Sequence, residues 1–138
     1  MIELKNVHWI RFPTFTDPRG SLSEVGKIMP FKIERTYHVY NAEINTQRGD
    51  HAHLKNEQVY ACLNGKAIVI LDDGINKKEI ELSDPSQGLY VGPMIWSSIK
   101  YLESNTLFFV WNSRGYEPED YIKEYNEFLK IAHENLLQ

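Results

Sequence analysis

Short runs rich in β-branched and aromatic residues alternate with turn signals along most of the chain. Such residues favour strands, and short strands at regular spacing are typical of a β-sandwich or β-barrel. The runs are RTYHVYN, EQVYACL, KAIVILD, KEIEL, GLYV and TLFFVWN, separated by turn signals such as DPRG at 17–20, LNGK at 63–66 and SDPSQG at 83–88. We therefore expect an all-β domain over about residues 1–115, with a hairpin at Asp72-Asp73-Gly74, because Asp-Gly is a strong hairpin signal.

The hydrophobic period changes near the C-terminus. Pro118 suits the first turn of a helix, and acidic residues surround it, as the positive end of a helix dipole favours. Apolar residues then recur at three- and four-residue spacing at Tyr121, Ile122, Tyr125, Phe128, Leu129, Ala132 and Leu136. This pattern predicts an amphipathic helix over about residues 117–137 that packs on the β domain.

Composition and charge narrow the functional classes. The 138 residues fit one domain, 1–138, and are 42% hydrophobic and 25% charged, as in ordinary globular proteins. The net charge of −4 argues against nucleic acid as a partner, because binding phosphate backbones needs a basic surface. No apolar run is long enough for a membrane span or a signal peptide, and the single cysteine, Cys62, suits a reducing compartment, so we expect a cytoplasmic protein without a membrane partner.

The segment Arg48-Gly-Asp-His51-Ala-His53 carries the most chemical information. Residues two apart in a strand point to the same face, so the two histidines project together. With a carboxylate such as Glu57, paired imidazoles can bind zinc or iron. Alternatively, they can exchange protons with a substrate at neutral pH, because imidazole titrates in that range.

The spacing His-x-His-x3-Glu, followed by Gly65, resembles the first half of the cupin signature. Metal-binding cupins have another histidine in a second motif. The comparable stretch here, residues 88–98, has the glycine and proline framing but carries Ser97 where that histidine is expected. A two-histidine, one-carboxylate iron site is the weaker interpretation, and we predict no metal and no cofactor.

Nearly the whole chain resembles the sugar-nucleotide 3,4-ketoisomerases, cupins that act on dTDP-4-keto-6-deoxyglucose. The resemblance rests on Asp17–Leu22, Pro30–Tyr37, Arg48–His53, Glu57-Gln58, Cys62–Gly65, Ile70–Gly74, Gly88–Pro93 with Trp96, and Asp120–Phe128. It implies a cupin (RmlC-like) jelly-roll β-barrel with a C-terminal helix, a homodimer, and a metal-free isomerase. Such enzymes supply 3-keto sugars to aminotransferases, towards 3-amino-3,6-dideoxyhexoses of surface polysaccharides.

The reaction moves a ketone from C4 to C3, which needs a base at C3, an acid at C4 and donors for the developing oxyanion. We assign His51 as the principal base or shuttle and His53 as its partner; which of the two acts as base stays open. Tyr37 is implied by the resemblance as a hydroxyl donor near the sugar.

Further residues are expected to bind the dTDP-linked 4-keto-6-deoxy sugar. Arg48 is the best candidate for a phosphate or sugar clamp, and the family places the turn at Arg19 near the active site. Gln58 and Trp96 are expected to line the cavity, and Ser97 to lie near the sugar.

Departures from the family pattern leave part of the specificity open. Relatives often carry a larger ring or a guanidinium at Ser97 and a second tyrosine at His38, and 45–47 lacks their proline. The first two can change the C4 configuration of the product or the choice of substrate. Neither that configuration nor the nucleotide base is fixed by the sequence.

Three other functions remain open at this point. One is a cupin epimerase that reprotonates the carbon it started from. Another is a metal-dependent cupin oxygenase, which would need iron or zinc. The last is a non-catalytic sugar-nucleotide-binding module, in which loss of His51 would leave binding intact.

Overall fold

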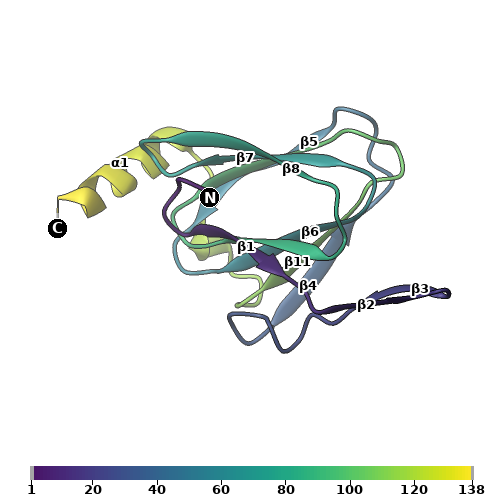
Figure 1. Ribbon diagram of the computed structural model, residues 1–138. Helices are drawn as coiled ribbons and strands as arrows, with labels where there is room; N and C mark the ends of the chain where they lie inside the picture. Colours follow the sequence, from purple (N-terminus) through teal and green to yellow (C-terminus); the bar gives the residue numbers. More distant parts are fainter. Residues whose placement is uncertain (1, 138) are drawn as a thin grey trace.

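The computed structural model describes residues 2–137, which form two antiparallel five-stranded sheets, a separate hairpin and a C-terminal helix (Figure 1). The first sheet has the order β1-β9-β6-β11-β4, with bounds Val7–Arg11, Gln87–Val91, Gln58–Asn64, Leu107–Asn112 and Arg35–Val39. The second has the order β12-β5-β10-β7-β8, with bounds Tyr121–Ile122, Gln47–His53, Trp96–Tyr101, Ala67–Asp72 and Lys77–Leu82. The predicted all-β cupin jelly roll is confirmed as a sandwich of two sheets, which hydrogen bonds do not close into one barrel.

The main core lies between the two sheets. Along β7, Ala67, Val69 and Leu71 are fully buried and alternate with half-buried residues, as expected for a strand with one face in the core. They belong to the same cluster as Leu89 of β9 and Val110 of β11 in the facing sheet. Burial of these apolar surfaces holds the sheets together.

The local strand predictions agree with the structure. Each of the six predicted runs contains a strand, and β7 and β8 pair from Ala67↔Leu82 to Asp72↔Lys77 around the Asp-Gly turn. The prediction did not identify β1, β10 or the two strands of the hairpin.

The predicted helix over 117–137 begins later than expected, and this part of the prediction was wrong. Pro118–Asp120 form a short 3-10 helix, Tyr121–Ile122 form β12, and the α-helix, α1, spans Tyr125–Leu136. Tyr121 and Ile122 pair with His53 and Ala52 of β5, so sheet hydrogen bonds replace helical ones there.

No helix in residues 2–137 is long and apolar enough to cross a membrane.

The hairpin of β2 (Thr14–Asp17) and β3 (Gly20–Ser23) projects away from the sandwich, on the opposite side from α1 (Figure 1). Two large apolar side chains on it, Phe15 and Leu22, are 66% and 61% exposed. Exposed apolar side chains on a projecting hairpin are typical of a surface that another chain covers.

Candidate active site

A cavity of about 420 Å³ opens between the two sheets. Tyr37 of β4 and Arg48 and His51 of β5 line it, together with Arg35 and with Tyr121 of β12. Small-ligand sites in proteins measure about 300–1,000 Å³. The cavity therefore brings three of the predicted site residues together in a space that suits a small ligand.

A β-bulge in β5 decides which side chains of this strand face the cavity. Where β5 pairs with β10, the register shifts by one residue between His51 and Gly49, and Asp50 is the extra residue. Gly49 and Asp50 have φ of 97° and 60°, in the left-handed region. Residues three apart in a regular strand face opposite sides, but one inserted residue brings them to the same side. Arg48 and His51 therefore both line the cavity.

His51 and His53 lie on the same side of β5, as predicted. Their ring centroids are 5.1 Å apart with the rings nearly perpendicular, and the Tyr121 ring contacts both, at 5.0 and 4.4 Å. Burial lowers the pKa of half-buried His51 below its ordinary value of 6.5. His51 is thus neutral at pH 7 and can accept a proton from a ligand in the cavity.

His53 lies deeper and has a carboxylate partner. Its side chain and that of Asp120 are each 6% exposed, and His53 Nδ1 lies 3.1 Å from Asp120 Oδ2. Burial, followed by the neighbouring His51, lowers the pKa of His53 to about 4, although the Asp120 carboxylate opposes this shift. Its other ring nitrogen, Nε2, is buried and has no hydrogen-bond partner in residues 2–137.

Behind Tyr37 lies a chain of buried polar side chains. Gln58 Nε2 donates to Asn112 Oδ1 at 2.9 Å and, more weakly, to the Tyr37 hydroxyl oxygen at 3.5 Å. Tyr60 OH donates to Gln58 Oε1 at 2.9 Å and accepts from Ser97 Oγ at 2.9 Å. Burial raises the pKa of Tyr37, so its hydroxyl is protonated and can donate. Gln58 and Ser97 thus position two tyrosines of the cavity wall.

Of the other predicted site residues, His53, Gln58 and Ser97 lie behind the side chains that line the cavity, and Trp96 and Arg19 lie away from it, contrary to expectation. Trp96 is on the outer face of the second sheet, where its ring lies 5.3 Å from Tyr125 and 5.7 Å from Phe128. Helix α1 therefore uses Trp96 for packing. Arg19 is at the tip of the projecting hairpin, pairs with Asp17 at 2.6 Å and is 90% exposed.

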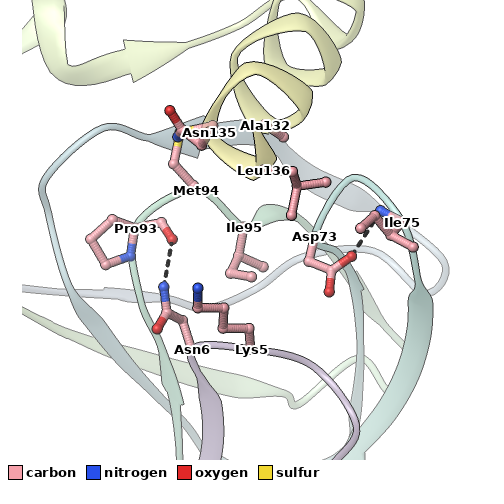
Figure 2. A pocket seen from close by; sticks show the side chains of 10 residues that line it. All are labelled: Lys5, Asn6, Asp73, Ile75, Pro93, Met94, Ile95, Ala132, Asn135 and Leu136. Carbon is pink, nitrogen blue, oxygen red and sulfur yellow. Dashed lines mark hydrogen bonds between the residues drawn. The ribbon is translucent and has the colours of Figure 1, made fainter. Parts of the chain in front are cut away.

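Another cavity, of about 230 Å³, lies between α1, the 93–95 turn and the first residues of the chain (Figure 2). Ala132 and Leu136 of α1 face Met94 and Ile95 there, with Lys5, Asn6, Asp73, Ile75, Pro93 and Asn135 around them. This lining has neither the histidines nor any other predicted site residue. The cavity between the two sheets is therefore the candidate active site.

The sequence analysis assigned no active-site role to Asp120, Tyr121 or Arg35. The Arg35 guanidinium lies 4.9 Å from the centre of the Tyr37 ring and donates to Tyr121 OH at 3.3 Å. Arg35 could have been found, because it precedes Tyr37 by two residues in the same predicted strand. Asp120 and Tyr121 were missed because they were predicted to lie in a helix.

Glu57, the carboxylate that would complete a metal site with the two histidines, contacts Tyr90 instead. Glu57 Oε1 accepts a hydrogen bond from Tyr90 OH at 2.7 Å, and Asp120 is the acid that contacts His53. Within residues 2–137, no group of three or more His, Cys, Asp or Glu side chains is placed to hold a metal ion.

Comparison with known proteins identifies relatives along nearly the whole chain. Residues 5–133 match the family described as FdtA: WxcM-like, C-terminal. The chain is 45% identical over 130 residues to TDP-4-oxo-6-deoxy-alpha-D-glucose-3,4-oxoisomerase of Aneurinibacillus thermoaerophilus, covering 92% of this chain and 94% of the relative.

Solved structures agree with this match. The sugar 3,4-ketoisomerase QdtA of Thermoanaerobacterium thermosaccharolyticum, in complex with TDP, superposes with a TM-score of 0.93 at 34% identity, covering 96% of this chain and 98% of that one. A histidine-to-asparagine variant of QdtA, in complex with TDP-4-keto-6-deoxyglucose, has a TM-score of 0.94 at 34% identity over 98% and 99% of the two chains.

Proposed function

The chain belongs to the family of FdtA and the WxcM-like C-terminal proteins, and on that premise we propose that it is a sugar-nucleotide 3,4-ketoisomerase. Its substrate is dTDP-4-keto-6-deoxyglucose, and its product is a dTDP-3-keto-6-deoxyhexose. The observation that carries this proposal is the histidine pair beside the inter-sheet cavity, in a chain 45% identical to an enzyme of that activity. The 3-keto product suits an aminotransferase that installs an amino group at C3, towards 3-amino-3,6-dideoxy sugars of surface polysaccharide.

The proton on C3 is acidic because the adjacent C4 is a carbonyl. His51 removes it, the C–H electron pair forms a C3=C4 double bond, and the carbonyl pair moves to O4, which gives an enediolate. His53 accepts the O3 proton and passes it to O4, C3=O forms, and protonated His51 returns a proton to C4. One proton has moved from C3 to C4 and one from O3 to O4, so the composition of the sugar is unchanged.

The remaining site residues have supporting roles in this proposal. Tyr37 donates a hydrogen bond to the negative charge that develops on the sugar oxygen. His53 is the partner of His51 for the oxygen protons. Arg48 lines the same cavity and binds the diphosphate by charge-assisted hydrogen bonds.

The test is proton NMR of chelator-treated protein with dTDP-4-keto-6-deoxyglucose in heavy water, beside the variants His51→Asn and His8→Asn. We expect the carbonyl to move to C3, deuterium to enter at C4, and His51→Asn to lose about 10²–10⁴-fold in kcat while it still binds TDP. His8 is the control, because it is exposed and stacks on Tyr90, 4.6 Å away, outside the cavity. The C4 coupling constants will give the product configuration.

Each rival function predicts a different spectrum. An epimerase leaves the carbonyl at C4 and exchanges the proton of the carbon it inverts. A metal-dependent enzyme is inactive after chelation and recovers with added iron or zinc. A binding module holds the ligand without turnover, and its binding survives His51→Ala.

A homodimer is part of the proposal, and Arg19 is the reason. It lies on the hairpin that projects away from the sandwich (Figure 1) and that carries exposed Phe15 and Leu22, and it does not line the cavity of its own chain. We propose that the hairpin packs on a second copy and brings Arg19 to the partner's active site. The single buried cysteine, Cys62, fits the cytoplasmic location that we propose.

A further inference from the structure

We propose that Asp120 is a positioning residue that fixes one tautomer of His53, with the proton on Nδ1 and an unprotonated Nε2 kept as a hydrogen-bond acceptor in the active site. The inference rests on the proposed function and deepens it, because it assigns a fixed direction to the second histidine of the proton shuttle.

The hydrogen bonds of Asp120 determine the tautomer. Its Oδ1 accepts from the backbone N–H of Lys55 at 2.8 Å, and its Oδ2 accepts from the backbone N–H of Asn56 at 3.1 Å. Backbone N–H groups can only donate, so both carboxylate oxygens act as acceptors. His53 Nδ1, 3.1 Å from Oδ2, must then donate as well and carries the ring proton.

The other ring nitrogen of His53, Nε2, has no hydrogen-bond donor beside it in residues 2–137. In a neutral imidazole with its proton on Nδ1, Nε2 has a free lone pair. His53 Nε2 is buried without a hydrogen-bond partner in residues 2–137, and buried polar atoms without partners are rare in native proteins. His53 lies behind the residues that line the cavity, so the donor that this acceptor fits is a hydroxyl of a bound sugar that displaces the lining beside His51.

The backbone fixes Asp120 against the histidine. β12 begins at the next residue and pairs Tyr121 with His53, and Leu54 N donates to Asp120 O at 2.9 Å. The Tyr121 ring also packs on the His53 ring, with centroids 4.4 Å apart. The carboxylate and the imidazole therefore keep one relative orientation.

The direct test needs no variant. Long-range ¹H–¹⁵N NMR of the imidazole rings, at pH 7.5 with TDP bound, should give His53 a protonated Nδ1 and an unprotonated Nε2. A protonated Nε2 in the wild-type protein contradicts the proposal, whatever the enzyme activity is.

Asp120→Asn is the kinetic test, with Asp84→Asn as the control. Asp84 also accepts from a backbone N–H and a side chain, both of Ser86, but in an exposed loop. An amide has one acceptor oxygen, so Asp120→Asn cannot serve all three donors. We expect kcat to fall about 10²–10⁴-fold, as when a histidine loses its orienting carboxylate. The Kd for TDP should change less than threefold, and the control should keep full activity.

A double variant shows whether Asp120 acts through His53. In a His53→Asn background, Asp120→Asn should reduce kcat by less than threefold further. Multiplicative losses, or a wild-type kcat in Asp120→Asn alone, contradict the positioning role. If the wild-type protein does not isomerise the sugar at all, the proposed function fails while the tautomer measurement still tests this inference.

Discussion

At the scale of single residues, two chemically identical side chains occupy different environments. His51 lines the cavity, whereas His53 is buried and contacts the buried carboxylate of Asp120. Burial disfavours the charged imidazolium, and the deeper ring has its pKa lowered to about 4. The pair therefore presents neutral imidazoles at pH 7, which suits proton abstraction from carbon.

The buried histidine makes stability depend on pH. The unfolded chain binds a proton at His53 near pH 6.5, but the folded protein binds it only near pH 4, so the unfolded state holds more protons between these values. We expect the free energy of unfolding to be unaffected by this group above pH 6.5 and to fall by roughly 3 kcal/mol between pH 6.5 and 4.

Urea unfolding of the wild-type protein and of His53→Gln at several pH values, with the protein concentration fixed, measures this loss. The variant should lose less stability than the wild type over the same interval. Equal losses would show that His53 is not held neutral.

At the scale of elements, the bulge in β5 matters more for the site than the regular part of the strand. A Cβ on Gly49 would lie 2.8 Å from the carbonyl oxygen of Ser97 and 3.3 Å from Cα of Ser98, both rigid backbone atoms of β10. Its φ of 97° also disfavours any side chain. Only glycine fits where β5 shifts its register and turns Arg48 into the cavity.

Gly49→Ala should therefore destabilise the protein by about 2 kcal/mol or more, because it adds a steric clash to a left-handed backbone. It should also lower kcat/KM, since relaxing the bulge moves Arg48 or His51 out of the cavity. Gly115→Ala is the matched control, because a Cβ there has no neighbour within 4 Å. Thermal unfolding and a coupled aminotransferase assay check both effects, and similar behaviour of the two variants would contradict the role of the bulge.

At the scale of the whole molecule, the active site of one chain is incomplete if Arg19 is required. The sandwich supplies the cavity and the histidines, whereas Arg19 belongs to the hairpin of β2 and β3. That hairpin projects on the side opposite α1 (Figure 1). In a two-fold dimer, the hairpin of each chain can reach the cavity of the other chain, so each active site would receive an Arg19.

Complementation tests this arrangement. We expect Arg19→Ala to raise KM about tenfold or more through loss of a charge-assisted contact, and His51→Asn to abolish turnover. A heterodimer of the two variants, isolated with two tags, should recover about half of the wild-type kcat/KM, since one of its two sites is then intact. An inactive heterodimer, a fully active Arg19→Ala homodimer, or a monomer in sedimentation experiments would contradict the proposal.

The sequence by itself determined the features that depend on near neighbours. Apolar runs between turn signals located β4, β6, β7, β8, β9 and β11, and the strand period placed His51 and His53 on one face. A strand period of two and a turn residue act over a few positions, so one sequence suffices to recognise them. The family resemblance then supplied the cupin jelly roll and the reaction class.

The tertiary structure alone decided which distant groups meet. Asp120 contacts His53 across 67 positions of sequence, and Tyr121 and Ile122 joined β5 although their spacing fitted a helix. Local propensities are small, and the pairing and burial of distant segments override them. The face of the sheet that α1 covers, and the side of the molecule on which Arg19 lies, likewise depend on how the whole chain packs.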